Sequence, residues 1–154
     1  MIRDVSGSGD GSGLHIGVAA ARWNQAITDR LVDGAVSRLR ELGVDEITVL
    51  RVPGALELPL AAQKLAEAGC DGVLAIGTVV KGETDHYDIV VRESSHGVTI
   101  VALQTGVPIA NAILAVHDYE LAVDRAGSGE ANKGVEAADA AVATVRAFRE
   151  LGQS

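Results

Sequence analysis

Three side chains with distinct chemistry lie within six positions of one another, at Lys81, Thr84 and His86. A lysine can hold an anion, a hydroxyl can bind a phosphate oxygen, and an imidazole can transfer protons near neutral pH. An apolar run from Val73 to Ile76 precedes them and a helix-compatible run from Ile89 to Ser94 follows, which together predict a strand, a turn and a helix. In an open parallel sheet, such a turn lies at the carboxyl end of a strand, where ligands bind.

The start of the helix after this turn has free backbone N–H groups, which favour an anion such as phosphate. Thr84 or Asp85 can cap that helix. Each feature also has an ordinary structural explanation, because turns with glycine occur in every α/β protein and most surface histidines are only solvated. The pattern alone therefore leaves a phosphate site and a plain turn both open.

Apolar and amphipathic runs alternate along the whole chain and predict strands that alternate with helices. Strands are expected at residues 14–21, 46–52, 71–80 and 99–103, with a further extended segment or strand at 108–116. Helices are expected at residues 27–42, 59–68, 85–95, 118–126 and 132–151. Glycines end four of these helices in the prediction, namely Gly43, Gly69, Gly97 and Gly127. The alternation is typical of a doubly wound parallel sheet with helices on both faces.

Composition limits the class of protein. The 154 residues suffice for one domain with a real core, and that core must be aliphatic because 47% of residues are hydrophobic but only 3% aromatic. The mean hydropathy of +0.22 is high for a soluble chain of this size and suggests apolar surface buried between subunits. The net charge of −8 argues against a nucleic-acid surface. The single Cys70 excludes an internal disulfide and a thiolate metal cage.

The chain is expected to be cytoplasmic and not to enter a membrane. No apolar run reaches the roughly 18 residues of a membrane span, and the first residues show no secretory signal. Residues 7–13 read GSGDGSG, which is not a dinucleotide fingerprint because Ser12 replaces the third glycine and the run precedes a strand. Residues 1–13 are therefore predicted to be a flexible segment before a single domain at 14–154.

Four further side chains each have a structural and a functional explanation. Trp23, the only tryptophan, can be an edge aromatic or a flat surface for a planar ring. Glu57 can cap a helix or accept hydrogen bonds from ligand hydroxyls. Arg125 can simply complement the dipole at the end of its helix, or it can bind an anion with its fork of donors. Lys133 lies in a first helical turn, where a cation is disfavoured, and that position hints at a ligand.

Three blocks of this sequence resemble those of the lumazine synthases. Residues 52–59 read VPGALELP, residues 77–88 read GTVVKGETDHYD, and DRAG at 124–127 is followed by NKG at 132–134. The first two are similar to the family patterns V-P-G-A-[FL]-E-[IL]-P and G-x-V-I-[RK]-G-x-T-x-H-[FY]-[DE]. The resemblance implies a flavodoxin-like α/β/α sandwich of three layers with a mostly parallel four-stranded sheet of order 2-1-3-4. It also implies that an N-terminal strand, Met1 to Val5, joins a neighbour's sheet.

The resemblance implies a transferase of riboflavin biosynthesis that uses no metal and no cofactor. It would condense 5-amino-6-(D-ribitylamino)uracil with 3,4-dihydroxy-2-butanone 4-phosphate to give 6,7-dimethyl-8-ribityllumazine, phosphate and water. His86 would shuttle protons. By the same resemblance, the pyrimidine and its ribityl chain would be bound by Trp23, Asn24, Ala55, Leu56, Glu57, Val79, Val80, Lys81, Asn111 and Lys133. The phosphate would be bound by Glu83, Thr84 and Arg125.

The sequence departs from the family pattern at several of these positions. Trp23 replaces the commoner Phe, and Lys81 replaces the commoner Arg and loses its forked donors. Asn111 replaces an aromatic residue and makes one wall of the pocket more polar. Glu83 and Asp85 add negative charge beside the phosphate site, so we expect their side chains to point to solvent.

The resemblance also implies a homo-oligomer whose basic unit is a ring of five, with Asn111, Arg125 and Lys133 supplied by the neighbouring subunit. The six-residue linker at 126–131 has the length of members that assemble into a sixty-subunit shell, and riboflavin synthase is a possible partner. Two alternatives are a non-catalytic shell protein of this fold and an archaeal-type riboflavin synthase. A flavodoxin-like nucleotide-binding module is disfavoured because the first loop, at residues 22–24, has no glycine or hydroxyl cluster.

Overall fold

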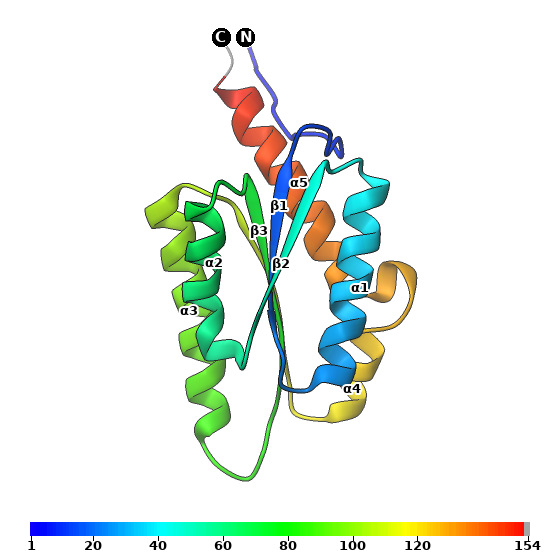
Figure 1. The fold of residues 1–154 in the computed structure, drawn as a ribbon, viewed down its shortest axis with the longest axis vertical. Coiled ribbons are helices and arrows are strands. Elements are labelled where there is room, and N and C mark those ends of the chain that lie inside the picture. The colour runs from blue at the N-terminus through cyan, green and yellow to red at the C-terminus, as the bar shows by residue number, and fades with distance from the viewer. Residues whose placement is uncertain (153–154) are drawn as a thin grey trace.

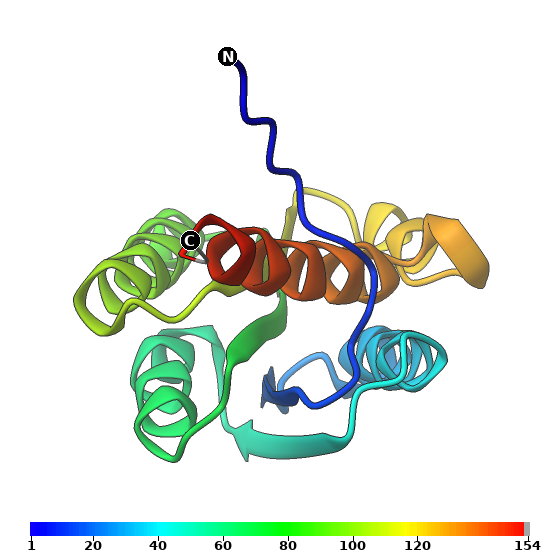
Figure 2. The same ribbon diagram turned by 90° about the horizontal axis from the view of Figure 1, so that it is seen from above.

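A parallel sheet of four strands lies between two layers of helices (Figures 1 and 2). The computed structural model describes residues 1–152, apart from the side chain of Glu130. The strands are β1 (His15–Ala21), β2 (Glu46–Val52), β3 (Gly72–Val80) and β4 (Ile109–Val116), in the order β2-β1-β3-β4. The helices are α1 (Gln25–Glu41), α2 (Leu58–Glu67), α3 (His86–Thr105), α4 (Tyr119–Arg125) and α5 (Lys133–Leu151). The predicted α/β class and strand order are confirmed.

Alternate residues of β1 face opposite helix layers, as the pleat of a strand requires. Ile16 and Val18 pack in a cluster with residues of α1 and α5, whereas Ala19 and Ala21 pack in a second cluster with residues of α2 and α3. Both central strands, β1 and β3, are covered on both faces, so they read as continuous apolar runs. These apolar runs are visible in the sequence. The predicted strand at residues 46–52 has the same bounds as β2.

The predicted strand at 99–103 is wrong, because α3 continues through these residues to Thr105. The run is rich in β-branched residues, which favours a strand, but the buried positions Val90, Ser94, Val98 and Val101 recur with helical spacing. The helix ends at Gly106, which has a φ of 71°. The fourth strand is β4, at the segment for which the sequence left an extended segment and a strand open.

Gly97 does not end α3 as predicted, and its role is one of close packing. A Cβ atom on Gly97 would lie 2.6 Å from Cγ of Pro59, the second residue of α2. The missing side chain therefore lets α3 approach α2. A glycine inside an amphipathic run has this alternative meaning, which only the neighbouring element reveals.

The segment before β1 runs along α5 and then leaves the body of the molecule (Figure 2). The Arg146 guanidinium donates to the carbonyl oxygen of Asp10 at 2.6 Å, and the Arg3 guanidinium donates to that of Glu150 at 2.7 Å. Met1 and Ile2 at its tip are fully exposed. Among the helices of residues 1–152, none is long and apolar enough to cross a bilayer.

Candidate active site

The loops that follow β1, β2 and β3 meet at the carboxyl edge of the sheet, the lower edge in Figure 1. A cavity of about 250 Å³ opens there. It is lined by Ala21, Trp23, Asn24, Ala55, Leu56, Glu57, Thr78, Val79, Val80, His86 and Val90. We call this cavity the carboxyl-edge pocket. It brings together the predicted site residues of three loops that are far apart in the sequence.

Trp23 forms one wall of the carboxyl-edge pocket. Its backbone N–H donates to the carbonyl oxygen of Pro53 at 3.0 Å, which fixes the turn after β1 to the turn after β2. A Cβ atom on Gly54 would lie 2.5 Å from Cε3 and Cζ3 of Trp23, so the indole rests against the bare backbone of Gly54. The side chain is still 64% exposed, which leaves a flat apolar surface for a planar ligand.

Glu57 closes the turn on which the indole rests. Its Oε2 accepts a hydrogen bond of 3.0 Å from the backbone N–H of Gly54. An ionised carboxylate has about four acceptor positions, so one bond to the backbone leaves most of them free. The residue is exposed at the pocket, and its structural and binding roles are therefore compatible.

A polar network fixes the base of the pocket. Asn24 has a φ of 58°, a left-handed conformation that asparagine tolerates, and its Nδ2 donates to the carbonyl oxygen of Thr78 at 2.8 Å. The Thr28 and Thr78 hydroxyls are 3.2 Å apart, and Thr28 also donates to the carbonyl oxygen of Trp23 at 3.3 Å. Both threonines are buried, so these bonds hold α1, β3 and the indole turn in one arrangement.

His86 is the first residue of α3 and lies exposed at the mouth of the pocket. The loop before it, residues 81–85, is exposed throughout, including the acidic Glu83 and Asp85. Asp85 occupies the N-cap position, but its side chain makes no capping hydrogen bond. The cap that the sequence favours is therefore not formed by Asp85, and the first N–H groups of α3 remain accessible to an anion.

The model of the 6,7-dimethyl-8-ribityllumazine synthase family matches residues 13–149. This chain belongs to the 6,7-dimethyl-8-ribityllumazine synthase family. It is 42% identical to the 6,7-dimethyl-8-ribityllumazine synthase of Nitratidesulfovibrio vulgaris over 153 residues, which cover 97% of this chain and 98% of that protein. It is 48% identical to that of Kineococcus radiotolerans over 142 residues, which cover 91% and 88% of the two chains.

Six residues that the lumazine synthase resemblance assigns to the site are absent from the lining of the carboxyl-edge pocket. Lys81, Glu83 and Thr84 lie in the exposed loop just before His86, and the other three lie on other elements. Asn111 lies on the edge strand β4, where its Oδ1 accepts from the Ile113 N–H at 2.9 Å and its Nδ2 donates to Ser95 Oγ at 3.2 Å. Arg125 is the exposed last residue of α4. Lys133 begins α5 and forms an ion pair of 3.1 Å with Glu136. One chain therefore does not bring these three side chains into its own pocket.

Three lining residues were not predicted from the sequence, namely Ala21, Thr78 and Val90. Ala21 ends β1 just before the indole turn, and Val90 lies one helical turn after His86. Helical spacing of four residues could have identified Val90 from the position of His86. Thr78 lies inside the second sequence block, but the pattern does not show that its carbonyl oxygen anchors an asparagine.

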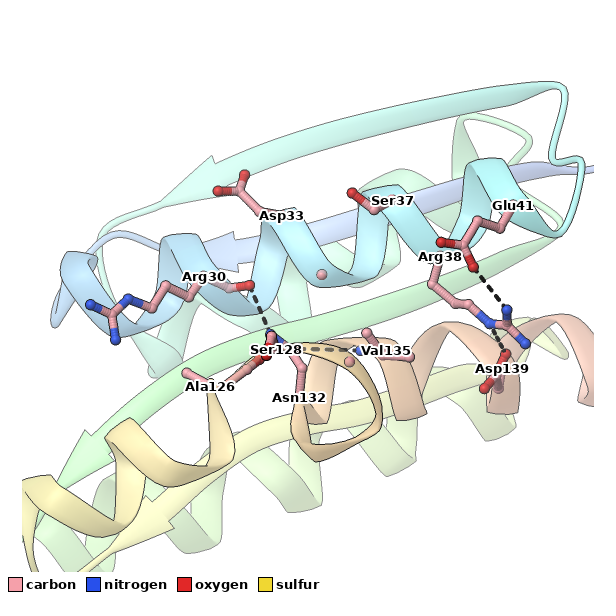
Figure 3. Close-up of a pocket in the computed structure, with 13 residues that line it drawn as sticks. Arg30, Asp33, Ser37, Arg38, Glu41, Ala126, Ser128, Asn132, Val135 and Asp139 are labelled. Atoms are coloured by element: carbon pink, nitrogen blue, oxygen red, sulfur yellow. Dashed lines mark hydrogen bonds and ion pairs between the residues drawn. The ribbon is translucent and has the colours of Figure 1, made fainter.

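A larger cavity of about 710 Å³ lies elsewhere, between α1, α5 and the linker that joins α4 to α5 (Figure 3). Its rim carries exposed ion pairs, such as Arg38 with Glu41 at 3.0 Å and with Asp139 at 2.7 Å. It contains none of the predicted site residues. The smaller carboxyl-edge pocket is the better candidate for chemistry, because it alone of these two combines an exposed aromatic ring, a carboxylate and an imidazole.

Proposed function

We propose that this chain condenses 5-amino-6-(D-ribitylamino)uracil with 3,4-dihydroxy-2-butanone 4-phosphate in the cytoplasm, yielding 6,7-dimethyl-8-ribityllumazine, phosphate and water. The observation that carries the proposal is the meeting of Trp23, Glu57 and His86 in one pocket of a chain that belongs to this family. Each comes from a different loop, and each offers a different interaction. Together they match a substrate with a flat ring, a polyhydroxyl chain and a reacting amine.

The carboxyl-edge pocket offers several contacts for the pyrimidine substrate that are already in place before it binds. The Trp23 ring stacks on the heterocycle, and the backbone groups of Val79 and Val80 hydrogen-bond its polar edge. Glu57 accepts hydrogen bonds from ribityl hydroxyls with the lone pairs that Gly54 leaves free. Asn24 takes part through its Oδ1 and the second N–H of its Nδ2, because only one N–H of Nδ2 donates to the Thr78 carbonyl oxygen.

The reaction then requires proton transfer and loss of phosphate. The substrate amine attacks the ketone and forms an imine with loss of one water, and phosphate is then eliminated. The ribityl-bearing nitrogen closes the ring, and loss of a second water gives the lumazine. His86, at the mouth of the pocket, moves protons in these steps. The Thr84 hydroxyl, the N–H of Glu83 and the N-terminus of α3 bind the phosphate, whereas Lys81 serves the pyrimidine and its ribityl chain. Holding two substrates together supplies much of the acceleration, on the order of 7 kcal/mol or more for well-oriented pairs.

The proposal includes an oligomer in which a neighbouring subunit completes each site with Asn111, Arg125 and Lys133. Their absence from the chain's own pocket supports this arrangement. Large apolar side chains are also exposed, with Leu103 at 80%, Leu60 at 60% and Phe148 at 59%. Such surface is usually buried between subunits. The unit is a ring of five, and the short linker at residues 126–131 allows further assembly into a shell.

The decisive experiment is to mix the two purified substrates with the protein and follow lumazine absorbance and fluorescence. Product is expected only when protein and both substrates are present, at a rate proportional to protein concentration. Incubation with lumazine alone tests the archaeal-type riboflavin synthase alternative. Riboflavin from that incubation, with no product from the two substrates, would overturn the proposal, and no product from either would favour the non-catalytic shell.

A further inference from the structure

A buried asparagine joins three elements at one side of the large cavity. Asn132 lies between the linker after α4 and the start of α5, and it faces the middle of α1 (Figure 3). It is only 4% exposed. A polar side chain is buried at a cost unless its hydrogen-bonding groups are all satisfied, so its partners show what it holds together.

The amide of Asn132 uses all of its hydrogen-bonding capacity. Nδ2 donates to the carbonyl oxygens of Arg30 in α1 and Gly127 in the linker, each at 3.0 Å. Oδ1 accepts from the N–H groups of Gly134 and Val135, at 2.8 and 3.3 Å, and so caps α5. One side chain therefore ties α1 and the linker to the first turn of α5.

Capping alone does not explain an asparagine at this position. Serine and aspartate cap helices about as well, but neither carries the two N–H donors that reach Arg30 and Gly127. The two donated bonds are therefore what the asparagine adds to a cap.

Glycines make room for this amide on both sides. A Cβ atom on Gly34 of α1 would lie 2.6 Å from Cγ and Oδ1 of Asn132, and one on Gly134 would collide with the carbonyl oxygen of Leu31. The contact between α1 and α5 is thus built around the Asn132 side chain, and the site has no room for a shift of the amide.

We propose that Asn132 is a positioning residue for the two cations at the ends of the linker, Arg125 and Lys133, and so sets how this subunit presents them to phosphate and pyrimidine in its neighbour's site. The inference rests on the proposed function. Arg125 ends α4 two residues before Gly127, and Lys133 follows Asn132 directly. Both cations are therefore fixed to the body of the domain through one amide.

The variant Asn132→Ser tests the tether, because serine keeps the capping oxygen and loses the two donated bonds. We expect KM for the phosphorylated substrate to rise about tenfold, with inorganic phosphate weakened as a competitive inhibitor to a similar degree, because the lost bond to Gly127 releases the linker that follows Arg125. KM for the pyrimidine should change far less, because the retained capping oxygen still holds the first turn of α5, where Lys133 lies. Ser128→Ala is the matched control, because Ser128 lies in the same linker and makes no capping bond with its side chain. It should leave all three constants unchanged.

A purely structural role predicts a different result. Asn132→Ser would then lower the melting temperature and the amount of assembled protein, but KM per active enzyme would match the wild type. That outcome overturns the inference. A wild type that does not condense the substrates overturns the proposed function instead, and the inference with it, so the two failures are distinguished by the wild-type assay.

Gly34→Ala provides an independent test from the α1 side, away from the linker. Alanine should favour the helix, so any loss must come from its collision with the Asn132 amide. We expect the same selective rise in KM for the phosphorylated substrate. Combined with Asn132→Ala, which removes every atom beyond Cβ, Gly34→Ala should add little further effect. Equal effects of Gly34→Ala in both backgrounds, or none in either, would contradict the proposal.

Discussion

At the scale of single residues, His86 carries the clearest mechanistic prediction. It lies at the mouth of the carboxyl-edge pocket, where its side chain is exposed and is not part of the hydrophobic core. His86→Ala should lower turnover by up to about 10², because proton transfer is lost but the two substrates are still held together. Affinity for a ribityl-pyrimidine analogue should stay nearly constant. Steady-state kinetics and calorimetry measure the two effects, and a variant with wild-type turnover would remove His86 from the mechanism.

Cys70 is a second titratable residue, at the opposite end of the sheet from the pocket. Burial, followed by the charges of Asp71 and Glu46, raises the pKa of the Cys70 thiol from 9.0 to about 11. The folded chain thus holds this proton more tightly than the unfolded chain. The protonated thiol therefore contributes its full share to the stability of the fold below pH 9, and this contribution is lost as the pH rises toward 11.

We therefore expect Cys70 to react slowly with Ellman's reagent in the native protein at pH 8. We also expect the wild type to lose stability relative to Cys70→Ala between pH 9 and 11, by up to about 1.4 kcal/mol per pH unit. Urea titrations at several pH values measure the difference. Rapid native labelling at pH 8, or a pH-independent difference in stability, would contradict the raised pKa.

At the scale of elements, Gly97 lies inside α3, where the sequence predicts that the helix stops. Gly97→Ala would stabilise an isolated helix by up to about 1 kcal/mol. In this fold its Cβ would lie 2.6 Å from Pro59 Cγ, and we expect a net loss of about 1–3 kcal/mol in the free energy of unfolding. Gly82→Ala is the control, because a Cβ there meets nothing within 4 Å. Denaturant unfolding of both variants checks the prediction, and a stabilised Gly97→Ala would refute the tight contact between α2 and α3.

The sequence predicts most elements because their apolar spacing is a local property. It predicts the three loops of the pocket because their residues form contiguous blocks after β1, β2 and β3. The sequence does not predict the part of α3 beyond Ser95, because the β-branched residues there favour a strand and Gly97 favours the end of a helix. The role of Gly97 in packing becomes clear only from its contact with α2. The hydrogen bond from Asn132 to Arg30 cannot be predicted from the sequence either, because the acceptor is a backbone carbonyl 102 residues away. Local patterns thus identify most segments, and long-range contacts decide the remaining ones and how the segments are held.

At the scale of the whole molecule, assembly is the main expectation. The exposed Leu103 and Phe148 are expected to be covered by another subunit. By the resemblance, the short linker with Gly127 and Gly129 has the length expected for assembly into a shell. We expect a hollow particle of sixty chains built from rings of five. The charge of −8 per chain should favour dissociation at low salt, where repulsion is least screened. Light scattering and negative-stain microscopy measure the size of the particle. A uniform ring of five at physiological salt would rule out the shell. A monomer would also rule out a site shared between subunits.

Sharing of the site between subunits can be tested by complementation. His86→Ala and Arg125→Ala should each be severely impaired alone, the first in proton transfer and the second in binding of the phosphorylated substrate. When the two variants are co-expressed in equal amounts, some interfaces pair an intact His86 with an intact Arg125 from the neighbouring chain. For random mixing in a ring, about one quarter of the interfaces are of this kind, so activity should recover to about a quarter of the wild type. If His86 and Arg125 instead acted within one chain, no site in the mixture would be intact, and activity would not exceed the average of the two variants measured separately.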